Sequence, residues 1–354
     1  MNWTSRLNKN AIILMCVVIS FSSNSSYAAD SNLATSDTLN KNYELGDGYR
    51  LGDSGFNLGG YSSLQLQNLQ STDVKTSLSH LSLFVWWEGN SPFKFFTEID
   101  SQNLLSADDQ SNDNDGRYFS VERLYLEYTL SDTLALRAGK FLTPIGRWNQ
   151  IHADPLVWTT SRPLITVNLF PDHFTGGVAS GTVDISGHQA DYILYTSVGT
   201  DVKADPTENP FNEAVGGRLN FAATKNVQIG LSFASFDQAS SKDEHELLIG
   251  SDFIWKIGKI ELSSEAAFRK SSYGGQNNAW GGFFQGVIPL HGKLFGIARI
   301  ESIHNPLLQQ DTKLIVSGLN YQHSRAISLK AEFIHGIRTD ISSAGFLSSV
   351  SILF

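Results

Sequence analysis

Acidic, basic and imidazole side chains gather in one stretch, TPIGRWNQIHADPLVWTTSRPLITVNLFPDHF (residues 143–174). The pairs His152-x-Asp154 and Asp172-His173 contain residue types used in acid–base catalysis and in metal binding. Their spacing matches no established motif, because the sequence has no HExxH, GxSxG, P-loop or CxxC pattern. We therefore expect no enzyme, no catalytic residue, no metal ligand and no cofactor.

A second candidate for metal chemistry is the acidic stretch SNDNDGRYFSVE. It places Asp113, Asp115, Gly116 and Glu122 at the offsets of a calcium-binding loop, but Ser111 stands where the leading Asp is required. A solvated run of charges is the favoured interpretation. An outer loop that holds divalent cations between lipopolysaccharide phosphates is the alternative.

The N-terminal residues have the layout of a secretory signal. Arg6 and Lys9 precede the apolar run 11–21, and small residues surround a cleavage position after Ala28. The run is too short for a membrane-spanning helix, which needs roughly 20 residues. Cys16, the single cysteine, lies within it, so we expect a mature chain without disulfides. Residues 1–28 are thus predicted to be a signal peptide.

A polar linker is predicted over residues 29–54, and residues 55–354 alternate between apolar and polar side chains. In RLYLEYTL, for example, Leu124 and Leu126 share one face of a strand while Arg123 and Glu127 share the other. We count about 16 such segments of about 10 residues, the length of a tilted membrane-spanning strand. This pattern predicts an all-β fold, a transmembrane antiparallel β-barrel of about 16 strands.

The connections between these segments alternate between short turns and longer polar loops, as in outer-membrane barrels. A β-sandwich also has period two, but nothing forces its loops to alternate in length. A sheet in a bilayer must close, because bare backbone groups are costly in hydrocarbon. We therefore expect the last strand, SSVSILF, to pair with the first, with Val350, Ile352 and Phe354 facing lipid.

Two stretches, LGDGYRLGDSGFNLGGYSSLQL and LRAGKFLTPIGRWN, resemble segments of the phosphate-selective porin O/P type and of related general Gram-negative porins. The strand that ends in Gly139, Lys140 and Phe141, followed by Pro144 and Gly146, carries the best match. The resemblance implies a trimeric, water-filled channel with one loop folded inward. It does not settle the solute, because the phosphate-selective members carry rows of basic residues, whereas this chain has a formal charge of −9.

The third outer connection, about 30 residues long, is unusual for an unpaired segment and indicates function or disorder. Its many large apolar side chains argue against disorder, so we expect this long third loop to fold inward and narrow the lumen. Packing on a neighbouring subunit is the alternative. The charged and imidazole side chains that it would offer to the pore are Arg147, His152, Asp154, Arg162, Asp172 and His173.

Charged strand residues are expected on the lumen side, because a charge facing lipid near the midplane costs roughly 2–4 kcal/mol. The expected wall residues are Glu98, Asp100, Arg123, Glu127, Arg137 and Arg218. A basic strip containing Arg123 and Arg137 could face the acidic residues and produce a transverse field across the pore. The alternative is that these charges form ordinary salt bridges that stiffen the wall.

Together these features predict an outer-membrane porin of a Gram-negative bacterium that passes small hydrophilic solutes or ions by passive diffusion. The alternative is a barrel with a narrow lumen that serves as an adhesion or structural protein through its outer loops. Expected partners are outer-membrane lipid, lipopolysaccharide and two further copies in a homotrimer. No nucleic acid is expected, because the chain is acidic and has no basic cluster.

Overall fold

The computed structural model describes residues 42–70, 73–108, 118–131, 133–199, 201–203, 208–274, 277–306, 310–338 and 344–354. The predicted signal peptide and the linker up to residue 41 lie outside this range. The described residues form one antiparallel sheet of 19 strands, of which 16 are long and three are short. The predicted number of long strands is therefore confirmed.

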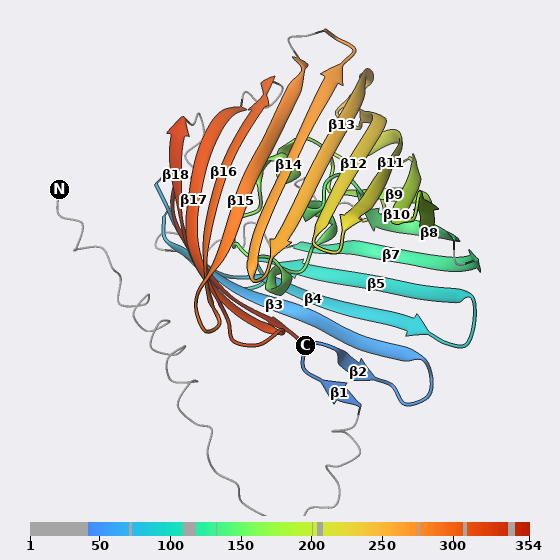
Figure 1. Cartoon of the computed structure of the whole chain (residues 1–354), viewed down its shortest axis with the longest axis horizontal. Coiled ribbons are helices and arrows are strands. Elements are labelled where there is room, and N and C mark those ends of the chain that lie inside the picture. The colour runs from blue at the N-terminus through green and yellow to red at the C-terminus, as the bar shows by residue number, and fades with distance from the viewer. Residues whose placement is uncertain are drawn as a thin grey trace, which may run out of the picture. The chain divides into compact units, whose positions relative to one another are not determined.

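The long strands follow one another around a curved wall in chain order (Figure 1). They are β3 (Phe56–Leu69), β4 (Lys75–Glu88), β5 (Phe93–Gln102), β7 (Tyr118–Ser131), β8 (Leu134–Leu142), β9 (His173–Ile185), β10 (His188–Val198), β11 (Phe211–Thr224), β12 (Val227–Gln238), β13 (Ser241–Ile257), β14 (Ile260–Ser271), β15 (Ala279–His291), β16 (Leu294–Asn305), β17 (Gln310–Gln322), β18 (Ile327–Arg338) and β19 (Gly345–Leu353). The short strands are β1 (Tyr43–Glu44), β2 (Gly48–Arg50) and β6 (Ser106–Asp108).

The sheet closes on itself, because β19 pairs with β3 in a register that runs from Gly345↔Leu69 to Leu353↔Tyr61. The backbone of the terminal residue continues this seam: Phe354 N–H donates to Gly60 O, and Gly60 N–H donates to Phe354 O, both at 2.8 Å. Closure leaves no free strand edge along the ring, as a barrel in hydrocarbon requires. The expected pairing of the last strand with the first is confirmed.

The two faces of the barrel differ in the way that the alternating sequence predicts. Large apolar side chains such as Leu126, Ile249 and Ile300 are half or more exposed on the outer face (50%, 65% and 56%). Charged side chains such as Glu98 and Arg299 are fully buried on the opposite face (0% for both). The buried polar face is the inner face of the barrel, and the exposed apolar face is the outer one.

Two boundaries differ from the sequence prediction. The stretch DQASSKDEH (residues 237–245), whose polar composition is typical of the longer connections, lies mostly in β12 and β13, which are separated by residues 239–240 alone. The end of the predicted linker contains β1 and β2, and β2 pairs with β3. Polar composition alone indicated loop in both places, but backbone pairing with a neighbouring strand extends the sheet over them.

The longest connection joins β8 to β9 and covers residues 143–172. It contains the 3₁₀ turns η2 (Trp148–Gln150) and η3 (Asp154–Leu156) and the short helix α3 (Leu164–Asn168). Over the described residues, no helix has the length and apolar character needed to cross a membrane. We call residues 143–172 the β8–β9 segment.

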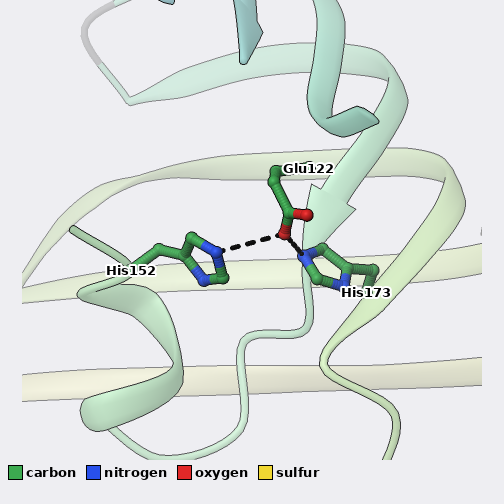
Figure 2. Close-up of side chains that lie close together, drawn as sticks. All are labelled: Glu122, His152 and His173. Atoms are coloured by element: carbon green, nitrogen blue, oxygen red, sulfur yellow. Dashed lines mark ion pairs between the residues drawn. The ribbon is translucent and has the colours of Figure 1, made fainter. Parts of the chain in front are cut away.

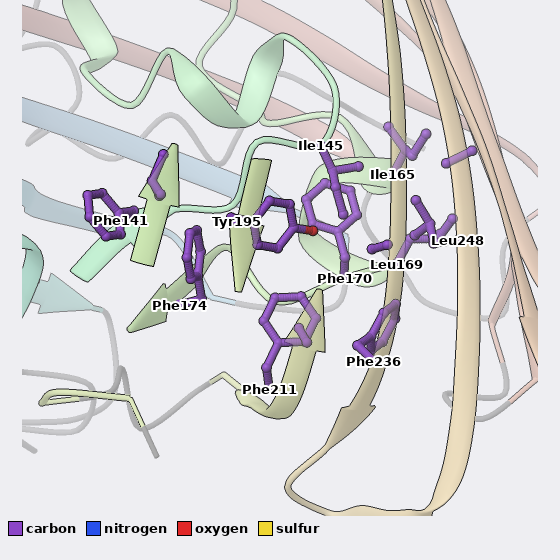
Figure 3. Close-up of a cluster of buried hydrophobic side chains, with 14 of the residues drawn as sticks. Phe141, Ile145, Ile165, Leu169, Phe170, Phe174, Tyr195, Phe211, Phe236 and Leu248 are labelled. Carbon is purple, nitrogen blue, oxygen red and sulfur yellow. The ribbon is translucent and has the colours of Figure 1, made fainter. Parts of the chain in front are cut away.

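Apolar side chains of the β8–β9 segment pack into the largest buried cluster of the described residues (Figure 3). Ile145, Ile165, Leu169 and Phe170 come from the segment. The strands supply aliphatic and aromatic partners, and the aromatic ones include Phe141, Phe174, Tyr195, Phe211 and Phe236. The expectation that this segment is too apolar to be disordered therefore has a packing basis, although Leu156 is 56% exposed and does not contribute.

Candidate functional site

The β8–β9 segment leaves the sheet through a sharp turn at Gly146, whose φ is +66°. A side chain at this position would also clash with the carboxylate of Glu265 on β14. Glycine is therefore required for two reasons, the left-handed backbone and the close approach of Glu265. One oxygen of this carboxylate, Oε1, accepts the amide protons of both Arg147 at 2.9 Å and Trp148 at 2.6 Å.

Two further carboxylates of the inner face accept backbone N–H groups of the segment. Glu332 on β18 accepts from Thr160 at 3.0 Å and from Ser161 at 2.7 Å. Glu301 on β16 accepts from Leu164 at 2.8 Å. Backbone donors in an unpaired segment need partners when they are buried, and hydrogen bonds to ionised acceptors are the stronger kind.

Wall cations complete the attachment by donating to oxygen atoms of the segment. Arg299 on β16 donates to Thr159 Oγ1 and Ser161 Oγ, both at 2.7 Å. Lys330 on β18 donates to Asp154 O and Thr159 O. Arg269 on β14 donates to Leu169 O at 3.1 Å. Two wall asparagines also donate to the segment: Asn305 to Asn168 O at 2.7 Å and Asn320 to Trp158 O at 2.9 Å.

These attachments lie far around the ring from the ends of the segment. The segment begins at β8 and ends at β9, and β16 is eight strands from β8 in either direction around the closed sheet. Its hydrogen-bond partners on β14, β16, β17 and β18 therefore belong to the part of the wall opposite its own ends.

The six residues predicted for this segment have different environments. Arg147 donates to Gln228 on β12 at 3.0 Å, and the backbone oxygen of Asp172 accepts from Asn149 Nδ2 at 2.9 Å. Arg162 Nη1 lies 3.4 Å from His152 Nδ1. His152 and His173 are buried and both contact the carboxylate of Glu122.

Asp154 is surrounded by positive groups. Its burial raises the pKa of the carboxyl group, but the charges of His80 and Lys330 and a hydrogen bond from Ser63 outweigh the burial, so that the pKa is lowered. Asp154 is therefore an anion at neutral pH. Of the six predicted residues, the structure brings His152 and His173 together, whereas Asp154 faces a different part of the wall.

The six wall residues all lie on the inner face, and each is buried or half-buried. They pair with neighbours rather than forming separate strips. Arg123 Nε lies 2.6 Å from Glu98, and Arg137 Nε lies 3.5 Å from Glu127. Asp100 contacts His80 at 2.8 Å, and Arg218 forms a two-fold ion pair with Asp252.

The predicted transverse field between a basic strip and an acidic strip is therefore wrong for these residues. Arg123 and Arg137 lie on the same part of the wall, β5 to β8, as Glu98 and Glu127. Strand alternation places charges on the inner face, but it does not say which charges become neighbours across the ladder. The alternative interpretation, that they are salt bridges of the wall, describes their contacts.

Glu122 lies on the inner face, although the alternation of side chains along the strand did not place it there. With Arg123, Tyr125 and Glu127 on the inner face, a strict period of two would turn Glu122 outward. A bulge in β7 opposite Glu98 and Ile99 interrupts the register and places Glu122 and Arg123 both on the inner face. A bulge gives almost no sequence signal, so the neighbours of Glu122 could not be predicted (Figure 2).

Cavities remain beside the segment. One of about 330 Å³ is lined by Arg123, Gln150 and His152 among others, and one of about 130 Å³ is lined by Arg123, Arg137 and Tyr125. A third of about 230 Å³ is lined by Arg147 and Glu261. Arg123, Arg137 and Arg147 thus lie next to open volume, and Arg123 and Arg137 do so although they are ion-paired.

The fold is shared with several solved outer-membrane proteins. OmpF of Salmonella typhi, solved with daunomycin, superposes with a TM-score of 0.60 at 9% identity over 86% of this chain and 99% of that chain. A loop-deletion mutant of OmpT, an outer membrane protein of Vibrio cholerae, gives 0.59 at 10% identity over 84% and 99%. An anion-selective porin from Comamonas acidovorans gives 0.54 at 12% identity over 84% and 97%.

Comparison of sequences gives less information than comparison of structures. No family model matches the sequence. An uncharacterized protein of Aquifex aeolicus (strain VF5) is 25% identical over 225 residues, which cover 57% of this chain and 49% of that protein. The match thus covers about half the length of this curated relative. At these identities the comparisons establish the architecture, and the chain has the closed barrel fold of general porins.

Proposed function

We propose that this protein is an outer-membrane porin that passes small hydrophilic solutes or ions by passive diffusion, with the β8–β9 segment as the constriction. It uses no cofactor and catalyses no reaction. The single observation that carries the proposal is the attachment of a long unpaired segment to the opposite part of the inner wall by Glu265, Glu301 and Glu332. A segment held at both sides of a closed wall narrows the passage without needing an extra domain.

The proposed selectivity depends on the charges beside the remaining cavities. The chain is acidic overall, but Arg123 and Arg137 border open volume near the segment. Both arginines keep about a quarter of their side chains exposed (25% and 22%). Selectivity is set where the passage is narrowest, so these arginines favour anions there despite the negative total charge.

The membrane and the assembly are part of the proposal. The exposed apolar outer face fits a lipid bilayer, and the aromatic residues Tyr128, Trp255 and Trp280 are exposed at strand ends, where interface residues gather. The cleaved signal peptide, the contact with lipopolysaccharide and the homotrimer are also proposed. One solved neighbour, OmpT of Vibrio cholerae, is described as a trimer form at a TM-score of 0.56.

The alternative function is a barrel with a closed lumen that acts in adhesion or as a structural protein. The apolar cluster between the β8–β9 segment and the wall favours it, because side chains such as Leu169 and Phe174 fill interior volume. A barrel plugged in this way would present only its loops to a partner.

Conductance in planar bilayers separates the two functions. The mature protein, purified and refolded in detergent, is added to a lipid bilayer in 1 M KCl, and swelling of liposomes in sugar solutions is measured in parallel. Steady current steps with sugar entry that falls with solute size support the porin. Silent bilayers and liposomes that do not swell, from protein with the circular dichroism of a folded barrel, overturn it in favour of the closed barrel.

A further inference from the structure

Three side chains from separate parts of the chain converge inside the barrel: Glu122 on β7, His152 in the β8–β9 segment and His173 at the start of β9 (Figure 2). Glu122 Oε2 lies 2.7 Å from His173 Nε2 and 3.1 Å from His152 Nε2. One ligand atom of each residue lies within 4.8 Å of the other two, and all three side chains are buried.

These contacts leave the three atoms without hydrogen-bond partners. Both contacts have the length of an ion pair but not the angles of a hydrogen bond, so Glu122 Oε2, His152 Nε2 and His173 Nε2 face one another without a well-directed partner among the described residues. The side chains are only 1%, 5% and 4% exposed. Because buried polar atoms of native proteins normally have partners, three such atoms that converge on one point indicate a site for an ion.

The surroundings orient two of these residues for metal binding. His173 Nδ1 lies 2.8 Å from Glu208 Oε1, which can hold the proton on Nδ1 while an ion replaces the Nε2 proton that faces Glu122. Ser120 Oγ donates to the other carboxylate oxygen of Glu122, Oε1, so that Oε2 faces the two imidazoles alone. A carboxylate behind a ligating histidine is the usual outer partner in zinc sites.

We propose that Glu122, His152 and His173 bind one divalent transition-metal ion of the Zn²⁺ class, with water in a fourth position. Two imidazoles and a carboxylate are a ligand set that Zn²⁺ accepts, with bonds of about 2.0–2.2 Å. Ligand atoms of such a tetrahedron are ~3.3 Å apart. The two nitrogen–oxygen distances must therefore open, and the two histidine nitrogens, which lie within 4.8 Å of each other, must come to the same spacing. Rotation of the three side chains is the movement that this requires.

The ion has a route to the site and a structural consequence there. His152 lines the cavity of about 330 Å³, so that an ion can reach the site from the side of this residue. A bound ion would connect the β8–β9 segment, through His152, to β7 and β9. It would thereby fix the near side of the segment, as the carboxylates of the opposite wall fix the far side.

The contact of Arg162 with His152 competes with metal binding. Its Nη1 donates toward His152 Nδ1 at 3.4 Å, a contact that favours a proton on Nε2 rather than a free lone pair. Metal binding requires the proton on Nδ1, so that Arg162 must turn away. Arg162→Gln, whose amide oxygen can accept from Nδ1–H, is therefore expected to bind the ion at least as tightly as the wild type.

The test is a Zn²⁺ titration of the mature protein in detergent, stripped with a chelator and measured in competition with a chromophoric chelator. We expect one Zn²⁺ per chain. Glu122→Gln, His152→Gln and His173→Gln should each weaken it at least 10-fold, and Glu208→Gln by about 10- to 100-fold. His291→Gln, an exposed histidine in β15, is the matched control and should leave binding unchanged.

Two results would overturn the proposed site: Zn²⁺ binding by the wild type that is no tighter than binding by His173→Gln, or loss of binding in His291→Gln. In either case the three side chains form a buried ion-pair cluster and no metal site. A second measurement avoids variants that fail to fold. Co²⁺ added to the stripped wild type should give the intense visible absorption of a four-coordinate ion. The weak spectrum of hydrated Co²⁺ in the presence of folded barrel contradicts the proposal equally.

Discussion

Glu332 on β18 and Ser161 in the β8–β9 segment, 171 residues apart in the chain, are joined by a hydrogen bond of 2.7 Å from the Ser161 amide to Oε1. The second carboxylate oxygen, Oε2, accepts the preceding amide, that of Thr160, at 3.0 Å. A single side chain thus satisfies two successive backbone donors of a segment that has no sheet partner. The position of the segment depends on such bonds from wall side chains and on its apolar packing rather than on secondary structure of its own.

Glu332→Gln should loosen the segment at this point. The amide side chain has one acceptor oxygen instead of two, so that one buried N–H loses its partner, at a cost of about 1–3 kcal/mol. We expect faster hydrogen exchange at Thr160 and Ser161 and more noise in the open-channel current. Glu88→Gln, an exposed glutamate at the end of β4, is the control. Unchanged exchange and noise would show that the wall carboxylate does not hold the segment.

The double variant Arg123→Ala, Arg137→Ala should move the selectivity of the channel toward cations. It removes two positive charges that border the same cavity of about 130 Å³, whereas Glu98 and Glu127 remain. The reversal potential in a KCl gradient measures the change. Lys259→Ala, in the exposed turn between β13 and β14, removes a cation away from the cavity and should have no effect. If sign and size of the potential match the wild type, the passage lies elsewhere.

Gly146→Ala should destabilise the root of the β8–β9 segment by more than backbone strain alone. An alanine at φ +66° costs about 1–2 kcal/mol, and its Cβ would also displace Glu265. Gly258→Ala is a close control, because its φ is +62° and a side chain there meets no atom within 4 Å. The measurement is the temperature at which the barrel loses its compact mobility in gel electrophoresis. If Gly146→Ala and Gly258→Ala lower this temperature equally, the contact with Glu265 has no role.

The number of strands and the closure were predictable, because they depend on residue type at period two. Leu126 and Glu127 must point to opposite faces, and only one arrangement keeps charge out of lipid. The prediction that a strand ends at Gly139, Lys140 and Phe141 agrees with the structure, in which β8 stops at Leu142. Such features follow from local sequence and from the demand that a sheet in hydrocarbon closes.

The contacts within the lumen were not predictable. Arg123 was expected to oppose Glu98, but the register of β5 and β7 makes them direct neighbours. The inward position of Glu122 was missed, because the bulge that turns this residue inward leaves no mark in the alternating pattern. His152 and His173 were recognised as chemically capable residues, but their convergence depends on the path of an unpaired segment, which no periodicity describes.

The buried ion pair between Arg218 on β11 and Asp252 on β13 offers a test of the wall itself. Both side chains are buried (5% and 4% exposed), and they meet across β12, where Gly230 has no side chain to block them. Arg218→Met or Asp252→Leu alone leaves a buried charge without its partner and should cost about 3–5 kcal/mol. The double variant removes both charges and should recover most of that loss.

Urea unfolding followed by tryptophan fluorescence in detergent measures all three variants. The expected result is strong coupling, with the double variant more stable than either single one. Gly230→Ala on β12 disturbs the same ion pair from the strand that lies between the two residues, because its Cβ would clash with both side chains. Its loss of stability should resemble that of the single variants. Additive losses in the double variant would mean that the two charges are satisfied separately by water in the lumen, and that this part of the wall is wetter than the burial of Arg218 and Asp252 implies.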